Sequence, residues 1–121
     1  MSEHTAFDED LASLDGFLRS GDLTAALLHL EDFKARLTRY IRGEERVLFP
    51  VLERFIAVPA ATTAKMRSEH GRLQCLLDML CEALTHEDWQ NGFDTLCALR
   101  SVLLLHCEKE DRVLAPLLRL T

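Results

Sequence analysis

Residues that break helices or favour strands are scarce in this sequence. The 121 residues include five glycines and three prolines, and strand patterns are nearly absent. Apolar residues recur instead at intervals of three and four, which is the pattern of amphipathic helices. With so few turn residues, the chain can form only a small number of long helices. These features predict an all-α fold.

Basic charge is also in short supply, since 14 Lys and Arg residues stand against 20 Asp and Glu residues. The net charge of −6 offers no electrostatic attraction for nucleic acid or for an anionic membrane. The chain has no apolar run as long as a membrane span, and its N-terminus lacks the pattern of a secretion signal. We therefore expect a cytoplasmic protein whose partners include neither nucleic acid nor a membrane. The sequence identifies no protein partner.

Several familiar chemical motifs are missing as well. The sequence contains no Ser/His/Asp arrangement, no glycine-rich phosphate loop and no Cys-x-x-Cys pair. Its cysteines therefore lack the spacing of a zinc site. In a reducing compartment we expect all four to serve as small core residues; they are Cys75, Cys81, Cys97 and Cys107.

Four helical segments account for nearly the whole chain. The apolar pattern of the first ends at Gly21, and Asp22 can cap a second helix that extends past residue 50. A break near Pro59 precedes a third helix over about residues 62–84, and a fourth covers about residues 88–118. Helices joined by such short loops predict a single domain over residues 1–121. Its expected architecture is an up-down-up-down antiparallel four-helix bundle.

Three residues are unusual inside these helices. Pro50 and Pro116 each remove one helical hydrogen bond, so we expect each proline to kink or end its helix. Gly43 lowers the stability of the second helix by up to roughly 1 kcal/mol relative to Ala. Either a partner helix approaches closely at Gly43, or the glycine is a tolerated defect.

The most informative feature is an internal repeat with an offset of 66 residues. A helical hairpin that is repeated for packing alone requires matching apolar residues, whereas this repeat matches histidines and carboxylates. Repeated imidazole and carboxylate groups at one spacing predict a two-fold metal site inside the bundle. The matched pairs are Glu3 and Glu69, His4 and His70, Tyr40 and His106, Glu44 and Glu110, Glu45 and Asp111, and Pro50 and Pro116.

Helix geometry allows the repeated polar residues to meet in one layer of the bundle. In an antiparallel pair, residues equally distant from the turn lie at one level, and His70 and His106 each lie 18 residues from Asp88. The four-residue spacing of Tyr40 and Glu44 puts both on one helix face, which continues an apolar stripe. Buried carboxylates need compensating positive charge, and no Lys or Arg lies near them on these stripes. Iron, manganese or zinc ions suit such a mixture of imidazole and carboxylate groups.

With these residues the sequence resembles the hemerythrin-like family, the His-His-Glu cation-binding domains. Segments 40–50 (YIRGEERVLFP) and 106–116 (HCEKEDRVLAP) carry the resemblance, which covers essentially the whole chain. It implies a non-haem di-iron centre, with two iron ions joined by an oxo or hydroxo bridge. By that resemblance Glu44 and Glu110 bridge the ions, His70 and His106 hold one of them, and His4 and Tyr40 hold the other.

Two positions leave alternatives open. Position 40 holds Tyr where the family has His; a phenolate is a competent ligand of ferric iron, but Tyr40 can also merely pack and leave one ion short of a ligand. Asp111 has the spacing that hemerythrins proper use for one bridge, so it competes with Glu110, which the internal repeat favours. The metal itself is identified as iron only through the resemblance, because zinc and manganese fit the same ligand types.

Other polar residues near these positions are expected to be solvated. For four acidic residues the alternative role is to accept a hydrogen bond from the second ring nitrogen of a ligand histidine. His29 and His86 have no ligand-type partner in the repeat, and we expect both at the surface. The four acidic residues are Glu3, Glu45, Glu69 and Asp111.

The resemblance, together with Tyr40, predicts a di-iron protein that binds or reacts with a small diatomic or peroxide ligand. A phenolate ligand favours ferric iron, so peroxide or nitric oxide chemistry is expected over oxygen transport. One alternative is a non-catalytic iron-binding module that senses oxygen or redox state, or donates iron for repair of iron–sulfur clusters. Another is a structural bundle in which the site has decayed.

Overall fold

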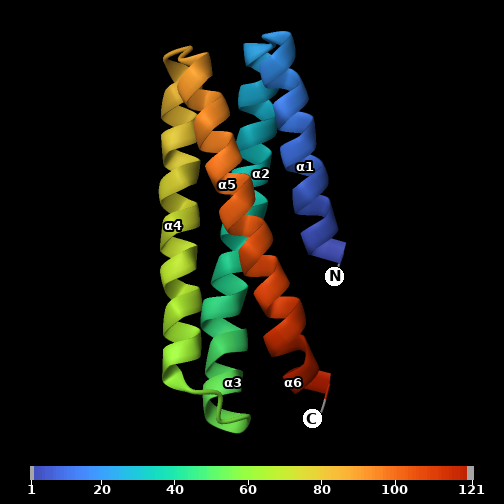
Figure 1. Ribbon diagram of the computed structural model, residues 1–121, viewed down its shortest axis with the longest axis vertical. Coiled ribbons are helices and arrows are strands. Elements are labelled where there is room, and N and C mark those ends of the chain that lie inside the picture. The colour runs from blue at the N-terminus through green and yellow to red at the C-terminus, as the bar shows by residue number, and fades with distance from the viewer. Residues whose placement is uncertain (1, 120–121) are drawn as a thin grey trace.

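The computed structural model describes residues 2–119, in which every regular element is helical. Eight elements follow one another along the chain. Elements α2, η1 and α3 run on without a break, and so do α5, η2 and α6, so the eight elements form four long helical columns (Figure 1). The predicted all-α bundle is confirmed. The elements are α1 (Ser2–Ser20), α2 (Leu23–Gly43), η1 (Glu44–Leu48), α3 (Phe49–Phe55), α4 (Ala60–Thr85), α5 (Trp89–Lys109), η2 (Glu110–Leu114) and α6 (Ala115–Arg119).

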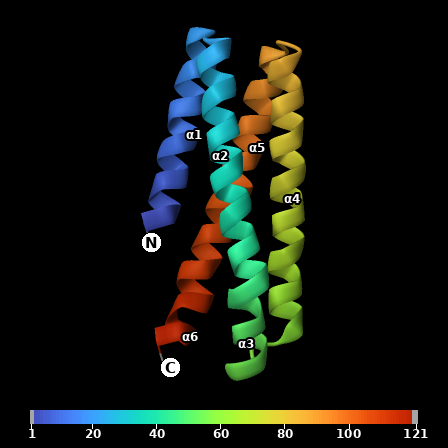
Figure 2. The same ribbon diagram turned by 180° about the vertical axis from the view of Figure 1, so that it is seen from behind.

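The helices pack as two antiparallel hairpins. Helix α1 pairs with α2 and α4 pairs with α5, while α1 also contacts α5 and α2 contacts α4. Helix α1 is the shortest column, and both views show that it starts partway along the bundle, while α3, α4 and α6 continue beyond it (Figures 1 and 2). The first residues of α1 therefore lie beside the middle of the other three columns.

The tight turns lie where the sequence predicts them, and they repeat. Gly21 has a positive φ of 71° after α1, and Glu87 has a positive φ of 54° after α4. The next residue is an aspartate each time, and its carboxylate accepts a hydrogen bond from the backbone N–H three residues on, at 3.1 Å for Asp22 and 3.2 Å for Asp88. Both caps satisfy amide groups that a helix start leaves unpaired. The internal repeat is therefore also a repeat of backbone structure.

Of the two outcomes expected at Pro50 and Pro116, a kink or a helix end, the helix end does not occur, because each column continues through its proline. A π-helical turn ends two residues before each proline, η1 before Pro50 and η2 before Pro116. The Phe49 N–H bonds to the Glu44 carbonyl, five residues back, and Ala115 bonds in the same way to Glu110. A proline has no N–H to donate, and its ring clashes with the carbonyl group of the preceding helical turn. The wider π turn accommodates both constraints.

Two hydrophobic clusters fill the bundle, one on each side of a polar layer. The larger lies among α1, α2, α4 and α5 and is rich in leucine. The smaller consists of Phe49, Leu52, Val58, Met66 and Leu114, near α3 and α6. Between them along the helices lie four buried ionisable residues, which are Glu44, His70, His106 and Glu110. None of the helices between residues 2 and 119 combines the length and apolar character that a membrane span needs.

The cysteines do not all belong to the core, contrary to expectation. Cys107 is buried and Cys81 is half-buried, but Cys75 and Cys97 are exposed. Helical periodicity explains the difference. Cys75 lies two residues from the buried Leu73, and Cys97 lies two residues from the buried Leu99. Residues two apart point to different faces of a helix, so both cysteines face away from the core. Burial, followed by the nearby Glu110 and Glu44 carboxylates, raises the pKa of Cys107 to about 12. This thiol is therefore unreactive at neutral pH.

Candidate metal centre

Three of the predicted site residues converge in the interior of the bundle. Glu44 is the first residue of η1, His70 lies on α4 and His106 on α5, and each offers one ligand atom within 4.8 Å of the others. His70 Nε2 lies 2.8 Å from Glu44 Oε1 and 3.2 Å from His106 Nε2. The side chains of His70 and His106 are 2% and 0% exposed. The group is thus dry, compact and rich in lone pairs.

The outward nitrogens of both histidines are already engaged. His70 Nδ1 lies 2.7 Å from Glu45 Oε2, and His106 Nδ1 lies 2.8 Å from Glu69 Oε1. Lys109 pairs with the other oxygen of Glu69 and holds that carboxylate in position. Because a carboxylate accepts a hydrogen bond from each Nδ1–H, both rings turn Nε2 inward, where it can carry a proton or, once that proton is lost, bind a metal ion. The structure therefore supports the alternative role of Glu45 and Glu69, which is to accept a hydrogen bond from the outward ring nitrogen of a histidine.

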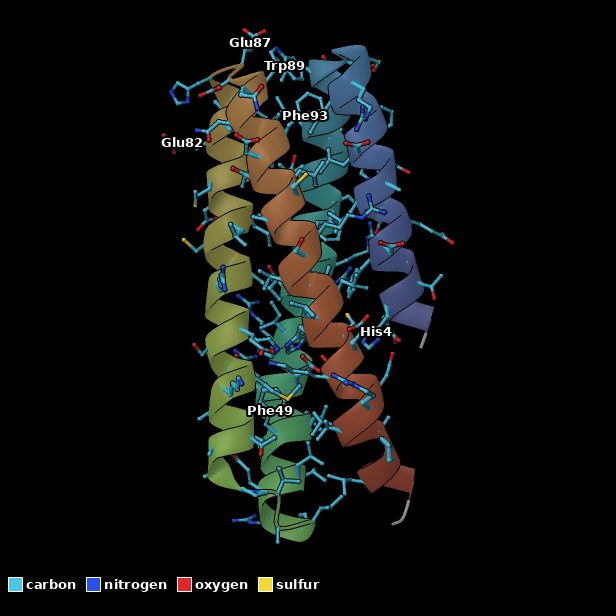
Figure 3. All side chains as sticks on the ribbon, viewed as in Figure 1. His4, Phe49, Glu82, Glu87, Trp89 and Phe93 are labelled. Carbon is cyan, nitrogen blue, oxygen red and sulfur yellow. The ribbon has the colours of Figure 1, made fainter. Side chains whose placement is uncertain are left out.

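A second group of predicted residues lies beside the first. His4 Nε2 is 2.7 Å from the Tyr40 hydroxyl and 3.4 Å from Glu110 Oε2. The Tyr40 hydroxyl donates a short hydrogen bond to the same oxygen of Glu110. His4 comes from the first turn of α1, and Figure 3 shows it next to the lower part of the α5 column. All six predicted site residues therefore lie in two adjacent groups of three.

Glu110 connects the two groups. One of its oxygens faces Tyr40 and His4, and the other lies 2.6 Å from His106 Nε2 without the geometry of a hydrogen bond. Asp111 points outward instead, with its side chain 48% exposed and an oxygen 3.4 Å from His4 Nδ1. Of the two candidates for the bridging position, the structure thus puts Glu110 inside the layer and Asp111 outside it.

The contacts of the two groups are copies of each other under the 66-residue offset. The contact between His70 and Glu44 corresponds to that between His4 and Glu110, and the contact between His70 and His106 corresponds to that between His4 and Tyr40. The outer pairs correspond as well, since Asp111 is the repeat partner of Glu45 and contacts His4, the repeat partner of His70. The sequence repeat therefore gives the polar layer approximate two-fold symmetry.

The exception to this symmetry is position 40. His106 has a second ring nitrogen that Glu69 accepts from, whereas Tyr40, its repeat partner, has one polar side-chain atom. Glu3, the repeat partner of Glu69, is exposed, as the sequence reading expected. Position 40 thus lacks an imidazole, and the carboxylate of Glu3, which would correspond to its partner, stays in solvent.

The layer is suited to a cation and is costly without one. Glu44 Oε2 and Glu110 Oε1 are buried and have no hydrogen-bond partner. A buried acceptor without a partner costs about 1–3 kcal/mol, and for Glu110 Oε1 the nearby His106 ring, at 2.6 Å, offsets part of this cost. The two inward Nε2 atoms also oppose their lone pairs at 3.2 Å unless a proton or a metal ion lies between them. Carboxylate oxygen and neutral imidazole are ligands that iron, manganese and zinc accept, so the residues fit the metal centre that the sequence predicts.

The pKa values of these groups reflect the same demand for positive charge. Burial opposes the charged form of His106, but the carboxylates of Glu110, Glu44 and Glu69 raise its pKa to about 10. Burial also opposes the charged form of Glu44, yet hydrogen bonds from His106 and His70 lower its pKa to about 2. Burial, then the negative charges of Glu44 and Glu110, raise the pKa of Tyr40 far above its usual value. Without a metal ion, Tyr40 is therefore a neutral phenol.

Sequence reasoning missed an aromatic support for His70. The ring of Phe49, which is fully buried below the layer (Figure 3), stacks on the His70 ring with 5.4 Å between centres and 11° between planes. The guanidinium carbon of Arg67 lies 5.2 Å from the centre of the Phe49 ring, and Arg67 is in turn paired with Glu53 at 3.0 Å. Arg67 lies one helical turn before His70, but sequence spacing alone does not indicate a stack across two helices.

The remaining histidines take no part in the polar layer. His86 is exposed, as expected. His29 is half-buried rather than at the surface, because its Nε2 lies 3.0 Å from the backbone carbonyl oxygen of Asp10 and its ring packs edge-on against Phe17.

A cavity of about 260 Å³ lies between α1 and α5, next to the second group. It is lined by His4 and Asp111 and by the apolar side chains of Leu103 and Cys107, among others. His4 therefore faces the polar layer on one side and this cavity on the other.

The family model described as Hemerythrin HHE cation binding domain matches residues 1–118. The match covers both hairpins and every residue of the polar layer. No curated protein and no solved structure matches the chain.

Proposed function

The chain belongs to the family of hemerythrin HHE cation-binding domains, and on that basis we propose that it is a non-haem di-iron protein that binds or reacts with small oxidants. The favoured ligands are peroxide and nitric oxide, with oxygen as a further candidate. A cytoplasmic location stays a prediction from composition.

One observation carries this proposal. The Nε2 atoms of His70 and His106 lie 3.2 Å apart, while Glu45 and Glu69 engage their Nδ1 atoms. Two Nε2 atoms this close need a cation between them; a proton on His106 supplies that charge in the metal-free protein, and a metal ion bound there would take its place. Packing alone does not explain why both rings keep this orientation.

The proposed ligand roles follow the two groups of residues. Glu44, His70 and His106 hold one iron ion, and His4, Tyr40 and Glu110 hold the other. Glu110 would be placed to bridge the ions because its two oxygens face different groups, and Glu44 would be the second bridging residue, since its Oε2 has no partner. Iron ions, when bound, supply one-electron redox chemistry and open coordination positions for small ligands. Zinc and manganese remain compatible with the ligand types.

The chain's own residues bias this chemistry toward ferric iron. Glu45 and Glu69 make the two buried imidazoles more basic by accepting their Nδ1 protons. Tyr40 would add a hard anionic ligand if its oxygen bound the ion and its proton passed to water. Such a ligand set lowers the reduction potential, so the proposal favours peroxide or nitric oxide chemistry over reversible oxygen carriage.

The proposal is tested first by metal content on protein purified without a metal-binding tag. Two irons per chain are expected by elemental analysis. A stably folded protein that takes up no iron, even on reconstitution with ferrous iron, contradicts the proposal.

A second test addresses Tyr40. Ferric protein should show a phenolate-to-iron charge-transfer band in visible light, and Tyr40→Phe should abolish it. Because the chain has no other tyrosine, the band has a single possible origin. An unchanged spectrum in Tyr40→Phe removes Tyr40 from the ligand set.

One observation favours the non-catalytic alternative, an iron-binding module that senses oxidants or donates iron. The cavity between α1 and α5 reaches His4, so the second iron position lies close to solvent. Under this alternative the fully loaded protein binds two irons but turns over neither peroxide nor nitric oxide. Steady-state turnover with both substrates distinguishes the two functions.

A further inference from the structure

The two groups of the metal centre are equivalent in the repeat but not in their surroundings. We infer that they hold metal with unequal strength, with a tight position at Glu44, His70 and His106 and an exchangeable position at His4, Tyr40 and Glu110. The exchangeable ion enters and leaves through the cavity between α1 and α5. The inference rests on the proposed di-metal function and adds an order of loading to it.

The outer hydrogen bonds support unequal strength. Both histidines of the first group donate from Nδ1 to a carboxylate, at 2.7 Å for His70 and 2.8 Å for His106. In the second group, His4 Nδ1 is 3.4 Å from Asp111, and Tyr40 has no second polar atom to hold. Loss of one such outer partner typically weakens metal binding by about 10–100-fold. The second group has one weak partner where the first group has two short ones.

Packing around the rings adds to the difference. Phe49 stacks flat on the His70 ring, and the guanidinium carbon of Arg67 lies 5.2 Å from the centre of the Phe49 ring. The repeat partner of Phe49 is Ala115, whose methyl group cannot form such a stack beside His4. The neighbouring aromatic ring of His4 is that of Tyr40, which meets it edge-on at 80°. The His70 ring is therefore held in its ligating orientation before metal binds, whereas His4 lacks this support.

Access differs in the same direction. The side chain of His4 is 8% exposed and lines the cavity between α1 and α5, whereas the side chain of His106 is 0% exposed. The cavity is bordered by Asp8, Glu108 and Asp111 against one basic residue, Arg100. An acidic border attracts cations, so an ion can reach the second group without opening the core.

The experiment is an anaerobic calorimetric titration of metal-free protein with ferrous iron. We expect two steps of one ion each, with dissociation constants that differ by at least about 10-fold. In a companion measurement, a chelator should remove one ion from the loaded protein well before the other.

Matched variants assign the steps to the groups. His4→Ala should abolish the weak step and retain the strong one, since His4 touches neither His70 nor His106 and reaches the first group only through Glu110. Tyr40→His, which supplies the missing second nitrogen, should tighten the weak constant by about 10-fold or more. The chelator measurement on wild-type protein needs no variant, so a variant that fails to fold does not remove the test.

Two outcomes overturn the inference while the proposed function stands. One is two ions bound with equal constants and released together. The other is loss of the strong step in His4→Ala, with the weak step retained. Failure of the proposed function looks different, because the wild-type protein then shows no binding step with ferrous iron.

Discussion

At the scale of single residues, the second nitrogen of each imidazole matters as much as the first. An acidic residue lies against the outward nitrogen of each histidine of the layer, at 2.7 Å for His70, 2.8 Å for His106 and 3.4 Å for His4. These contacts decide which nitrogen carries the proton, and therefore which one is free to bind metal. Glu45, Glu69 and Asp111 thus contact the histidines of the layer, whereas Glu3 stays exposed.

The first prediction concerns Glu69, with Glu3 as its control. Glu69→Gln should weaken iron binding by about 10–100-fold, because the amide is a poorer acceptor for His106 Nδ1 and does not pair with Lys109 as a carboxylate does. Glu3 occupies the matching repeat position but is exposed, so Glu3→Gln should leave affinity unchanged. Ferrous iron titration measures both. Equal losses in the two variants would mean that net charge, not the hydrogen bond, controls affinity.

The second prediction separates Glu110 from Asp111. Glu110→Gln should reduce binding from two iron ions to one or none, because a neutral amide cannot bridge two cations. Asp111→Asn should still bind two ions, with at most about a 10-fold loss at the weaker position. Elemental analysis of reconstituted, folded variants decides the matter. If Asp111→Asn loses an ion and Glu110→Gln keeps both, the bridge belongs to Asp111.

At the scale of elements, the two π turns are where helix geometry and site geometry meet. Each begins at a glutamate of the layer, Glu44 in η1 and Glu110 in η2. In η1 the consecutive residues Glu44 and Glu45 contact opposite nitrogens of the same His70 ring, at 2.8 and 2.7 Å. Single π turns in helices are frequent at functional sites. Here the turn lets the chain pass a proline and present two neighbouring carboxylates to one imidazole.

The glycine before η1 leads to the third prediction. A Cβ added at Gly43 would meet nothing within 4 Å, so no helix approaches closely there and the tolerated-defect interpretation holds. Gly43→Ala should raise the free energy of unfolding of the metal-free protein by about 0.5–1 kcal/mol, since alanine has less backbone entropy to lose. Gly16→Ala, at a similarly open position of α1, is the control. Urea denaturation measures both variants. Destabilisation by Gly43→Ala alone would indicate that the neighbouring π turn requires the glycine.

At the scale of the whole molecule, the polar layer separates two hydrophobic clusters. The larger cluster includes Ile41 and Leu73, and the smaller includes Phe49 and Met66, so the layer separates them along α2 and α4. Buried acceptors without partners make the layer a weak point of the metal-free protein. A bound cation therefore acts on stability as well as on chemistry.

This arrangement gives the fourth prediction. Ferrous iron present anaerobically at about 100 times its dissociation constant should raise the free energy of unfolding by about 2.7 kcal/mol per site, because the ion binds the folded state. Removal by a chelator should reverse the gain. Denaturation with and without iron measures the effect, and His29→Ala, outside the layer, should show the same gain as wild type. A gain that appears equally in Glu110→Gln would indicate binding elsewhere on the protein.

The sequence by itself determined the helices and their order, and it predicted the candidate site residues. Helical periodicity, the Asp22 and Asp88 caps and the scarcity of turn residues are local signals, and the structure follows them closely. The internal repeat identified six residues that the structure brings into one layer, because equal spacing from the turns becomes equal height in an antiparallel bundle. The family assignment also follows from the sequence.

Only the tertiary structure decided how these residues divide into two groups and which neighbours support them. The contacts of Glu45 with His70, of Glu69 with His106 and of Phe49 with His70 join different helices, and spacing along one chain does not encode them. Packing also decided that Glu110, and not Asp111, points into the layer. Adjacent helix residues point in different directions, and the packing of the helix sets which of them faces inward. The exposure of Cys75 and Cys97 and the continuation through Pro50 were likewise set by packing and backbone geometry. Local patterns specify elements, whereas the unequal environments of two repeated groups arise only when the elements pack.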